Sequence, residues 1–390
     1  MIRADILSVA RRFTQINDPA SIESLGSGNI NDTYLVKTNG GSLVIQRMNA
    51  NVFKDPCQVI GNMMAVSEHI KRRISRNDLE FLQPANRRWE TPQLIPTKDG
   101  CLNYHIETDG SYWRCMTFIE DCFTVDVLES VKQASEMGSA LGLFHRLVSD
   151  LDLTDFRDTL EGFHITPGYL KAYHRALVHT NQRPSAGTEL CIQFIREREA
   201  FADVLEQAKA RGEIPLRPIH GDPKINNVML DRQSGEAVAL IDLDTVKPGL
   251  VHYDLGDCLR SGCNPMGEET ADLDAVVFDL GLAEAILDGY FSVAGPMLTA
   301  AEVRLIPDAA RLISFELGLR FFSDYLNGST YFKANHPEHN LERALVQFQL
   351  TASIETQMES LRAMVERLAA ACKADAPATD AVSAARQQRP

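Results

Sequence analysis

The sequence predicts an α+β protein in which a small N-terminal lobe, built on a sheet, is followed by a larger helical C-terminal lobe. Three observations support this fold class. Strand-like runs separated by Gly, Pro and Asp-Gly turns recur up to about residue 120. Helical periodicity dominates from Val131 onward. One short apolar hairpin with acidic flanks, within residues 219–244, interrupts the helical part.

The chain opens with a short amphipathic segment, residues 1 to about 20, whose apolar side chains recur at helical spacing. A Gly-x-Gly turn, Gly26-Ser27-Gly28-Asn29, then precedes the strand-like run Thr33-Tyr34-Leu35-Val36. Glycines let backbone N–H groups approach phosphate oxygens without a Cβ in the way. No Gly-Lys-Ser/Thr follows, so the turn is not a Walker motif. Many hairpins contain two glycines, so a phosphate-covering role depends on the motif described below.

The next strand, residues 42–47, ends in Gln46-Arg47. Kinases place a Lys here that binds phosphates and pairs with a Glu on the following helix. The alternation leaves Gln46 or Arg47 in that place, and Arg47 has the charge and bidentate geometry for a phosphate. The following helix is predicted from about Asp55 to Ile74, with Asp55-Pro56 as cap and first turn. On this helix Glu68 is either the acidic partner or an ordinary exposed residue.

Residues 91–96 and 112–120 are predicted to be antiparallel strands, with Asp109-Gly110 as a hairpin turn between them. The stretch that contains Met116, Phe118 and Ile119 is the predicted connection between the lobes. An adenine ring is expected to meet its backbone groups there. Phe118 and Ile119 also fit a place in the core, and both roles can hold together.

The larger lobe is predicted to begin with a helix from Val131 that ends near His145, a residue expected to be buried and hydrogen-bonded. A polar helix is expected from about residue 187 to 211, and residues 268–370 are predicted to be mainly helical. From Lys373 the Ala, Pro, Asp and Gln content predicts a disordered tail. The expected division is therefore 1–120, 121–372 and a tail, 373–390.

The most specific stretch is His220-x-Asp222-x4-Asn227, followed fifteen residues later by Asp242 at the end of an apolar run. A lone His-x-Asp is common, but the full spacing is the layout of a kinase catalytic loop with a metal-binding Asp. Asp222 is predicted to orient the acceptor hydroxyl and accept its proton. Asn227 and Asp242 are predicted to hold Mg²⁺, which prefers hard oxygen ligands. His220 is predicted to brace the loop through hydrogen bonds.

The local pattern supports a shared metal. Residues 228–230 and 237–241 are short strand-like runs, and residues 231–236 contain the Ser-Gly of a hairpin turn. The hairpin carries Asn227 into one strand and Asp242 out of the other, so both emerge at the same end. Asp244, two residues on, is the second choice of ligand.

These residues carry a resemblance to a known superfamily. His220-Gly221-Asp222-Pro223-Lys224-Ile225-Asn226-Asn227-Val228, followed by Leu240-Ile241-Asp242, resembles the aminoglycoside phosphotransferase and choline kinase superfamily. The wording of both segments is most similar to the N-acetylhexosamine 1-kinases. The resemblance covers nearly the whole chain except the tail.

The resemblance implies a bilobal protein-kinase-like fold and ATP-dependent, Mg²⁺-assisted phosphorylation of a small-molecule hydroxyl. The first choice of acceptor is the anomeric hydroxyl of an N-acetylhexosamine. Arg320 and Tyr331 match the polar and aromatic groups that sugar 1-kinases place opposite the catalytic Asp. Asn29, in the glycine turn, is expected to reach the same space from the other lobe, and Asp222 to contact the reacting hydroxyl.

Two rival functions stay open. One keeps the chemistry and changes the acceptor to choline, an amino alcohol or an aminoglycoside. The other is a nucleotide-binding protein without catalysis, which the unusual Gln46-Arg47 strand end favours and the complete catalytic motif opposes. Asp254 and Asp257 are expected to be structural and to pair with Arg260, with a substrate role as the alternative. Residues 318–333 are either a pocket wall or a helix end packed on the core.

Composition excludes several other classes. The chain has 390 residues and a net charge of −14, whereas a nucleic-acid-binding protein normally carries a basic face. Eight scattered cysteines without a Cys-x-x-Cys pair predict neither a zinc site nor a disulfide framework, and suit a reducing cytoplasm. No signal peptide opens the chain, and no apolar run approaches the ~20 residues of a membrane span. A cytoplasmic protein that binds ATP and a small molecule is expected.

Overall fold

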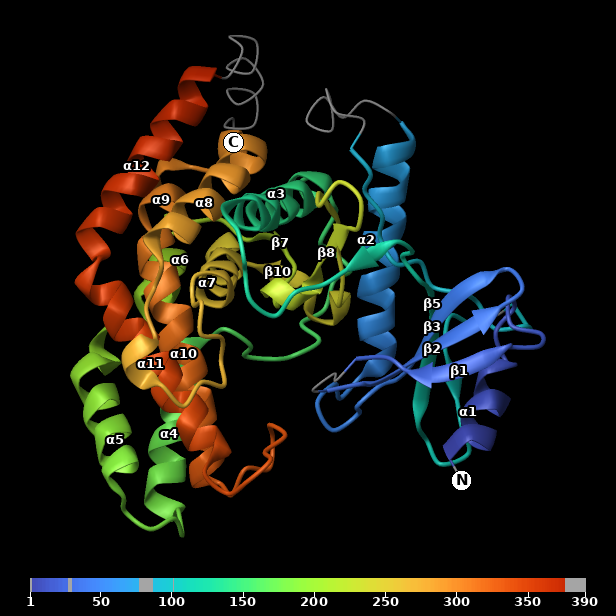
Figure 1. Cartoon of the computed structure of the whole chain (residues 1–390), viewed down its shortest axis with the longest axis horizontal. Helices are drawn as coiled ribbons and strands as arrows, with labels where there is room; N and C mark the ends of the chain where they lie inside the picture. The colour runs from blue at the N-terminus through green and yellow to red at the C-terminus, as the bar shows by residue number, and fades with distance from the viewer. Residues whose placement is uncertain (1, 27–29, 77–86, 101, 376–390) are drawn as a thin grey trace.

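The computed structural model describes residues 2–26, 30–76, 87–100 and 102–375. Figure 1 shows a smaller lobe that contains the N-terminus and a larger helical lobe, with helix α2 (Pro56–Ser75) between the small sheet and the larger lobe. The predicted fold class, α+β with a sheet lobe before a larger helical lobe, is confirmed.

The smaller lobe contains a five-stranded antiparallel sheet in the order β1-β2-β3-β5-β4. Its strands are β1 (Ser21–Ser24), β2 (Asp32–Thr38), β3 (Gly41–Arg47), β4 (His105–Ile106) and β5 (Tyr112–Thr117). Successive side chains alternate between the two faces of a strand. Leu43 and Ile45 therefore share one face, where they pack with Ile6 and Val9 of helix α1 (Ile2–Ala10). Val44 lies on the opposite face, which belongs to the main core with Met63 of α2.

One predicted strand is wrong. Residues 91–96 lie outside every strand, and Leu94 makes only an isolated bridge to Met116. The hairpin with the turn at Asp109-Gly110 joins β4, not residues 91–96, to β5. Pro92 and Pro96 have no backbone N–H to donate, so two of the six residues cannot support a ladder of hydrogen bonds.

Helix α2 begins where its cap chemistry predicts. The Asp55 side chain accepts the backbone N–H of Gln58 at 3.2 Å, and Pro56 occupies the first turn. Its buried face includes Val59, Met63 and Val66. This face fixes the helix between the sheet and the larger lobe.

The larger lobe is built from helices that pack around one large apolar cluster and two smaller ones. Its helices are α3 (Val131–Val148), α4 (Thr166–His179), α5 (Ala186–Arg198), α6 (Val204–Ala210), α7 (Val251–Gly262), α8 (Leu280–Ala294), α9 (Ala300–Arg304), α10 (Ile306–Leu326), α11 (His339–Thr356) and α12 (Met358–Asp375). Helices α3 and α8 cross at two glycines. A Cβ on Gly138 would lie 1.8 Å from the Ile286 carbonyl oxygen, and one on Gly289 would lie 2.1 Å from that of Ser135. Neither position has room for a side chain.

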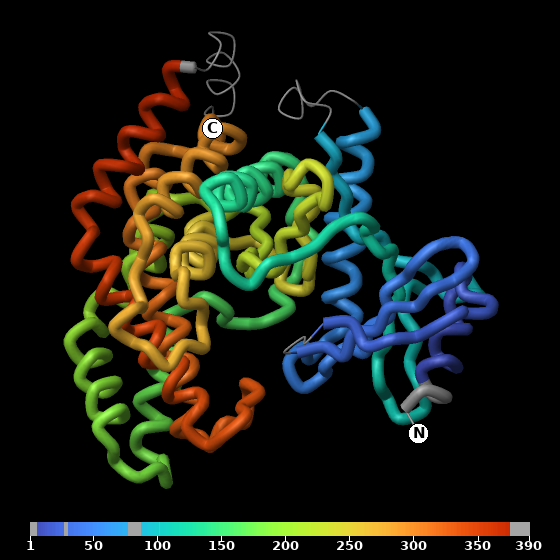
Figure 2. Tube along the Cα trace, in the orientation of Figure 1, coloured from blue at the N-terminus to red at the C-terminus, as the bar shows by residue number. Residues whose placement is uncertain are grey.

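Two small sheets lie at the centre of the molecule. Strands β8 (Val228–Asp231) and β9 (Ala237–Leu240) form the predicted antiparallel hairpin, and β6 (Cys122–Phe123) pairs with the edge of β8. Strand β7 (Arg217–Ile219) pairs with β10 (Lys247–Gly249). Figure 2 traces the chain from β5 across to α3, the path along which β6 lies.

Two helix predictions differ in their bounds. The expected polar helix over 187–211 is divided into α5 and α6 by a short 3-10 turn at Glu199–Phe201. The expected disordered tail begins too early, because α12 continues to Asp375; residues 376–390 lie outside the described residues. No helix in the described ranges combines the length and apolarity needed to cross a lipid bilayer.

Candidate active site

The backbone of the catalytic loop is held by a buried aspartate. Asp254, on α7, accepts the backbone N–H of His220 at 2.7 Å and that of Gly221 at 2.8 Å. It also accepts a hydrogen bond from Nε2 of His145 at 2.9 Å. Burial alone would raise the pKa of Asp254, but His145 and the loop donors outweigh it and lower the pKa. The expected structural role therefore takes the form of an anchor for the loop; only Asp257 makes the expected pair with Arg260, at 2.8 Å.

His164 holds the same loop from the other side. Its Nε2 donates to the Gly221 carbonyl at 2.7 Å and its Nδ1 to Glu316 at 3.0 Å. Both ring nitrogens face acceptors, so both carry protons. Burial by itself would lower the pKa of His164, but the Glu316 carboxylate outweighs it and raises the pKa above the usual value. Gly221 has φ +89°, and a Cβ there would lie 2.7 Å from the Thr245 carbonyl oxygen, so the position requires glycine.

His220 braces the loop as predicted. It is fully buried, and its Nε2 lies 2.9 Å from the Ile241 carbonyl oxygen. Its Nδ1 accepts the backbone N–H of Asp222 at 3.3 Å, so the proton of the neutral ring resides on Nε2. Burial lowers the pKa of His220, which agrees with a neutral ring. The imidazole thus connects the loop to the strand that precedes Asp242.

Asp222 lies beside a cation. Nζ of Lys224 is 2.6 Å from Asp222 Oδ2, and both side chains are half-buried. Burial would raise the pKa of Asp222, but Lys224 outweighs it and the pKa is lowered. The same pairing raises the pKa of Lys224. At neutral pH the site therefore presents an ionised carboxylate and an ammonium group together.

The hairpin brings the two expected metal ligands to one end. Ile241 donates its N–H to the Asn227 carbonyl at 2.9 Å, and Asp242 is the next residue. The amide nitrogen of Asn227 donates to the Asp222 carbonyl at 2.7 Å, which leaves Asn227 Oδ1 as the atom for a metal. Asp242 has φ 66° and ψ 60°, a left-handed conformation that costs a non-glycine residue about 1–2 kcal/mol.

The Asp242 side chain is exposed to solvent. Its carboxyl also has charged neighbours, which include Asp244, Lys224 and Asp222. Desolvation, followed by the charge of Asp244, raises its pKa to about 7. Within the described ranges no cluster of three or more His, Cys, Asp or Glu side chains forms a metal cage. Mg²⁺ normally uses only one or two carboxylates and completes its shell with phosphates and water. The oxygens of Asn227 and Asp242 fit such a site.

Asp244, the second choice of metal ligand, already contacts two side chains of the smaller lobe. Asn31 donates to its Oδ2 at 2.8 Å, and Arg114 Nη2 lies 2.5 Å from its Oδ1. Thr159 donates its hydroxyl to the Asp244 carbonyl at 2.8 Å. Among the described residues Oδ1 receives no aligned hydrogen bond, so the contact with Arg114 is an ion pair in which the N–H groups point elsewhere. This carboxylate joins the smaller lobe to the metal-binding segment.

The expected pairing of Arg47 with Glu68 is wrong. Arg47 shares the sheet face of Leu43 and Ile45, turned away from α2, and its guanidinium lies 3.5 Å from Asp109 at the surface. Glu68 is exposed on α2. The alternation of β3 places Arg47 on the outer face because it is one residue beyond Gln46.

The structure describes only part of the expected nucleotide site. Gly26 has φ +71° with open space where a Cβ would stand, while Ser27, Gly28 and Asn29 lie outside the described residues. Met116 is buried in β5. Phe118 and Ile119 follow it in the connection to β6, and Ile119 packs against Val238 and Ala239 of the hairpin.

Arg320 and Tyr331 lie on one wall of the larger lobe. The Arg320 guanidinium is 5.0 Å from the ring of Phe163, 5.2 Å from Tyr169 and 5.4 Å from Phe332. Burial would lower its pKa, but the neighbouring Tyr169 and Tyr331 and the charges of Glu316 and then Asp222 raise it. Tyr331 is 44% exposed. The wall therefore offers a cation, aromatic faces and an exposed phenol.

Four residues of the site escaped the sequence analysis: Asn31, Arg114, His164 and Lys224. Lys224 stands inside the motif and could have been recognised by its spacing of two from Asp222. The other three contact the site across long stretches of chain, for which the sequence has no local signal.

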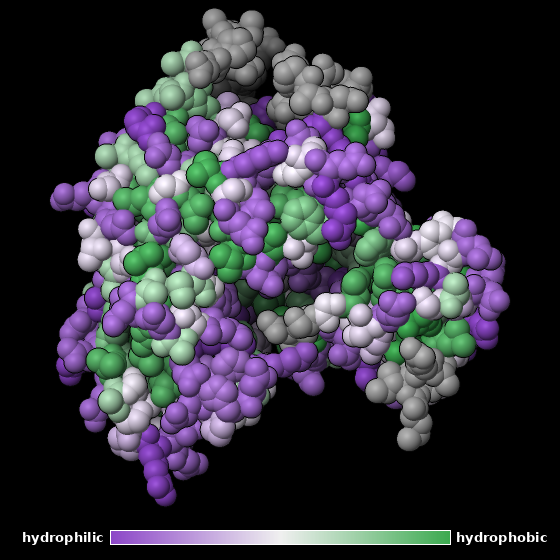
Figure 3. Space-filling model, viewed as in Figure 1, coloured by the Kyte–Doolittle hydropathy of each residue, from purple (hydrophilic) through white to green (hydrophobic). Residues whose placement is uncertain are grey.

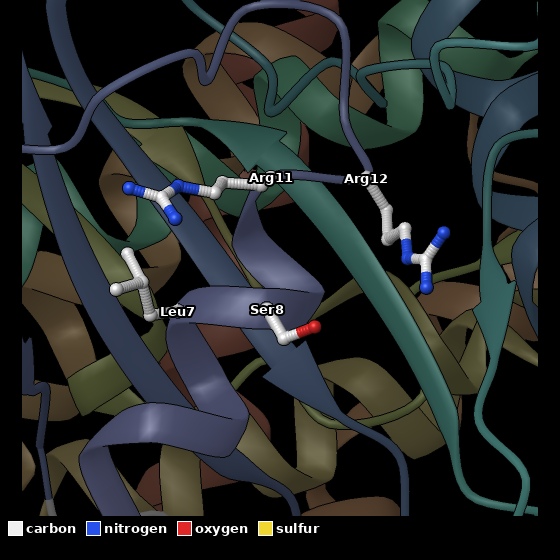
Figure 4. Close-up of a pocket in the computed structure, with 4 residues that line it drawn as sticks. All are labelled: Leu7, Ser8, Arg11 and Arg12. Atoms are coloured by element: carbon white, nitrogen blue, oxygen red, sulfur yellow. The ribbon is translucent and has the colours of Figure 1, made fainter.

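The hollow between the two lobes is visible in Figure 3. A separate surface cavity of about 300 Å³ lies at the end of α1 and is lined by Leu7, Ser8, Arg11 and Arg12. Figure 4 shows the Arg11 and Arg12 guanidinium groups pointing apart, and Arg11 already pairs with Asp18 at 3.4 Å.

A sheet lobe, a helical lobe and a loop that presents Asp222 beside Asn227 and Asp242 define a protein-kinase-like phosphotransferase. The model of the phosphotransferase enzyme family matches residues 21–290. The chain belongs to this family.

Solved structures share the fold over nearly the full length. The microcompartment-associated aminopropanol kinase has a TM-score of 0.60 at 15% identity, with 92% of this chain and 98% of that chain covered. An aminoglycoside phosphotransferase from Alicyclobacillus acidocaldarius has a TM-score of 0.58 at 15% identity, covering 92% and 96%. A spectinomycin phosphotransferase in complex with ADP and spectinomycin has a TM-score of 0.53 at 13% identity, covering 91% and 98%. At these identities the likeness concerns the fold.

Proposed function

We propose that the protein is an ATP-dependent, Mg²⁺-assisted kinase of a sugar, and that it phosphorylates the anomeric hydroxyl of an N-acetylhexosamine. The observation that carries the choice of acceptor is Arg320, a cation held among three aromatic rings. A neutral sugar needs directional donors and an apolar or aromatic face. Arg320, Tyr169 and Tyr331 supply both.

The same wall disfavours a positively charged acceptor. A bound ammonium group would meet the fixed charge of Arg320. Two acids beside the loop, Asp257 and Glu268, are both paired with Arg260. Arg260 carries a single positive charge, so it offsets about one of these two negative charges before any ligand binds.

The nucleotide would occupy the other side of the hollow. Its phosphates would meet the glycine turn that begins at Gly26, and its adenine the backbone of Met116, Phe118 and Ile119. The spectinomycin phosphotransferase that shares this fold was crystallised with ADP, which supports the use of a nucleotide here. Asn227 and Asp242 would hold Mg²⁺, which when bound offsets the charge of the phosphate oxygens.

Asp222 would act chiefly by orientation. A carboxylate whose pKa is lowered is a weak base towards a hydroxyl, and phosphoryl transfer passes through a loose transition state that needs little early proton removal. Asp222 would accept the hydrogen bond of the acceptor hydroxyl, aim its oxygen at the phosphorus, and take the proton late. Lys224 keeps Asp222 ionised, and its ammonium group would offset the charge of a phosphoryl oxygen.

The test is ATP consumption against sugars, amino sugars, choline, aminopropanol and aminoglycosides, followed by phosphorus NMR of the product. A phosphate coupled to the anomeric proton of N-acetylglucosamine or N-acetylgalactosamine supports the proposal. Arg320→Ala and Tyr331→Phe should raise KM for the sugar more than KM for ATP. Loss of the Tyr331 hydroxyl should cost about 0.5–1.5 kcal/mol, and loss of Arg320 more.

Other outcomes of the same screen decide for the rivals. Turnover of an amino alcohol, choline or an aminoglycoside without a sugar product favours a kinase of cationic acceptors; the fold shared with an aminopropanol kinase motivates that arm. Tight ATP binding with no turnover favours a non-catalytic nucleotide-binding protein.

The seven described cysteines are free thiols, which supports the proposal that the protein acts in a reducing cytoplasm.

A further inference from the structure

The face of the small sheet that packs against α2 carries a buried arginine, Arg114, on β5. Kinases place a lysine on the neighbouring strand, β3. Gln46 on β3 and Arg114 on β5 are direct partners in register. Both side chains point to the α2 side, since Arg114 Nη1 lies 3.5 Å from Met63 Sδ of that helix. Arg114 is only 1% exposed. The β3 position that bears the phosphate-binding lysine in kinases is neutral here, and the charge stands on the neighbouring strand.

Gln46 fixes the orientation of this guanidinium. Its Oε1 accepts hydrogen bonds from Arg114 Nε at 3.0 Å and from Nη2 at 2.6 Å. Its amide nitrogen donates to the Thr33 hydroxyl at 3.0 Å, which assigns the carbonyl oxygen to the arginine. Gln46 is neutral and accepts two hydrogen bonds from Arg114, so it can orient the guanidinium without neutralising its charge.

The carboxylate that pairs with Arg114 comes from the larger lobe. Kinases pair the strand lysine with a glutamate on the adjacent helix, but here α2 offers Met63 at the point of contact. The partner is Asp244, 2.5 Å away and equally buried, with side-chain exposures of 2% for Arg114 and 3% for Asp244. Asp244 lies in the short turn that begins directly after Asp242. A buried charge requires a partner, so this pair determines where the turn sits.

We infer that Arg114 is a positioning residue of the nucleotide site, which holds the Asp242–Asp244 segment against the small sheet in place of the usual lysine–glutamate pair. The inference rests on the proposed use of Mg·ATP. Asn31 ties the same carboxylate to the loop before β2 at 2.8 Å. With Arg114 removed, the segment loses its charged contact with the sheet, and the metal-binding carboxylate of Asp242 loses its fixed place.

The experiment measures the binding of a non-hydrolysable ATP analogue by calorimetry, with Mg²⁺ and with EDTA. Arg114→Met should weaken binding by about 10- to 100-fold when Mg²⁺ is present, because the buried ion pair that holds the metal-binding segment is lost. Binding in EDTA should change by less than about threefold, because the residue acts through the metal segment. A direct phosphate ligand would weaken both. Lys37→Met is the matched control, since Lys37 is an exposed cation of the same sheet.

A charge relocation sharpens the test. The double variant Gln46→Lys/Arg114→Met returns a cation to β3 opposite the vacated position, and it should recover part of the Mg²⁺-dependent affinity. Arg47→Met should bind as the wild type does, whereas a loss confined to Arg47→Met would assign the phosphate cation to Arg47 and overturn the inference.

Folding is checked for each variant by its thermal midpoint. If Arg114→Met does not fold, Gln46→Met is measured instead: it keeps the charge and removes the group that aims it, and should lose several-fold in Mg·ATP affinity. Wild-type Mg·ATP affinity in a folded Arg114→Met or Gln46→Met refutes the inference. Failure of the wild-type protein to bind Mg·ATP refutes the proposed function, a result distinct from any difference between variants.

Discussion

The loop anchor Asp254 offers the sharpest test of how the site is held together. In Asp254→Asn the amide keeps one acceptor oxygen and turns an NH₂ group towards donors. The carboxylate accepts from the backbone of His220 and Gly221 and from the ring of His145. At least one of these donors therefore loses its acceptor, and all three lose the negative charge.

The magnitude follows from these contacts. Hydrogen bonds to a charged group contribute about 1.5–3 kcal/mol each and neutral ones about 0.5–1.5 kcal/mol. Asp254 is fully buried, so solvent does not reduce the effect. With one such hydrogen bond lost and two weakened, we expect Asp254→Asn to lower the free energy of unfolding by about 3–5 kcal/mol. The kcat should also fall, because Asp222 follows the two anchored residues.

The assay is urea unfolding followed by circular dichroism, with kcat measured below the onset of unfolding. Asp288→Asn is the control, because Asp288 is exposed on α8 and its substitution should change stability by no more than about 0.5 kcal/mol. A folded Asp254→Asn variant within about 1 kcal/mol of the wild type, with unchanged kcat, would show that the carboxylate does not hold the loop.

Three further outcomes are expected. Asp222→Asn should lower kcat by about 10²-fold or more with little change in ATP affinity, and near-native kcat would remove Asp222 from its role. Asp242→Ala should abolish Mg²⁺-dependent nucleotide binding measured by calorimetry; unchanged affinity in a folded variant would exclude it as a ligand. Because the folded-state pKa of His164 is raised, its pairing with Glu316 stabilises the fold fully below pH about 6.5 and less as pH rises through the folded pKa. The loss of stability caused by His164→Gln, measured by thermal unfolding, should accordingly become smaller as the pH rises through the folded-state pKa of His164. A loss that does not depend on pH would contradict a charged His164–Glu316 pair.

The parts of the fold that the sequence predicts well depend on neighbours along the chain. The β8–β9 hairpin follows from two apolar runs and a Ser-Gly turn, and the start of α2 from Asp55-Pro56. The prediction of a strand at residues 91–96 was wrong. It was based on the apolar residues of the segment, but the two prolines leave too few backbone N–H donors for a regular ladder of hydrogen bonds.

The parts of the site that the sequence misses depend on distant contacts. Asn31 reaches Asp244 across 213 residues, and His164 reaches Glu316 across 152. The choice between Gln46 and Arg47 depended on which face of the sheet each side chain occupies, and a shift of one residue along a strand exchanges the two faces. Only the register of β3 against β5 shows that the inward cation is Arg114.

The junction between the lobes limits how they can move. Two separate stretches of chain meet the β8–β9 hairpin there: Glu90 donates its N–H to the Val238 carbonyl at 2.8 Å, and β6 pairs with β8 through Cys122 and Phe123. Arg88 joins the two stretches by donating to the Glu120 carbonyl at 2.9 Å. Helix α2 adds further contacts, because Asn62 donates to the Val246 carbonyl at 3.0 Å and Arg73 lies 2.6 Å from Asp150. A movement of the lobes relative to each other would therefore have to break contacts on the hairpin that carries Asn227 and Asp242 as well as contacts of α2.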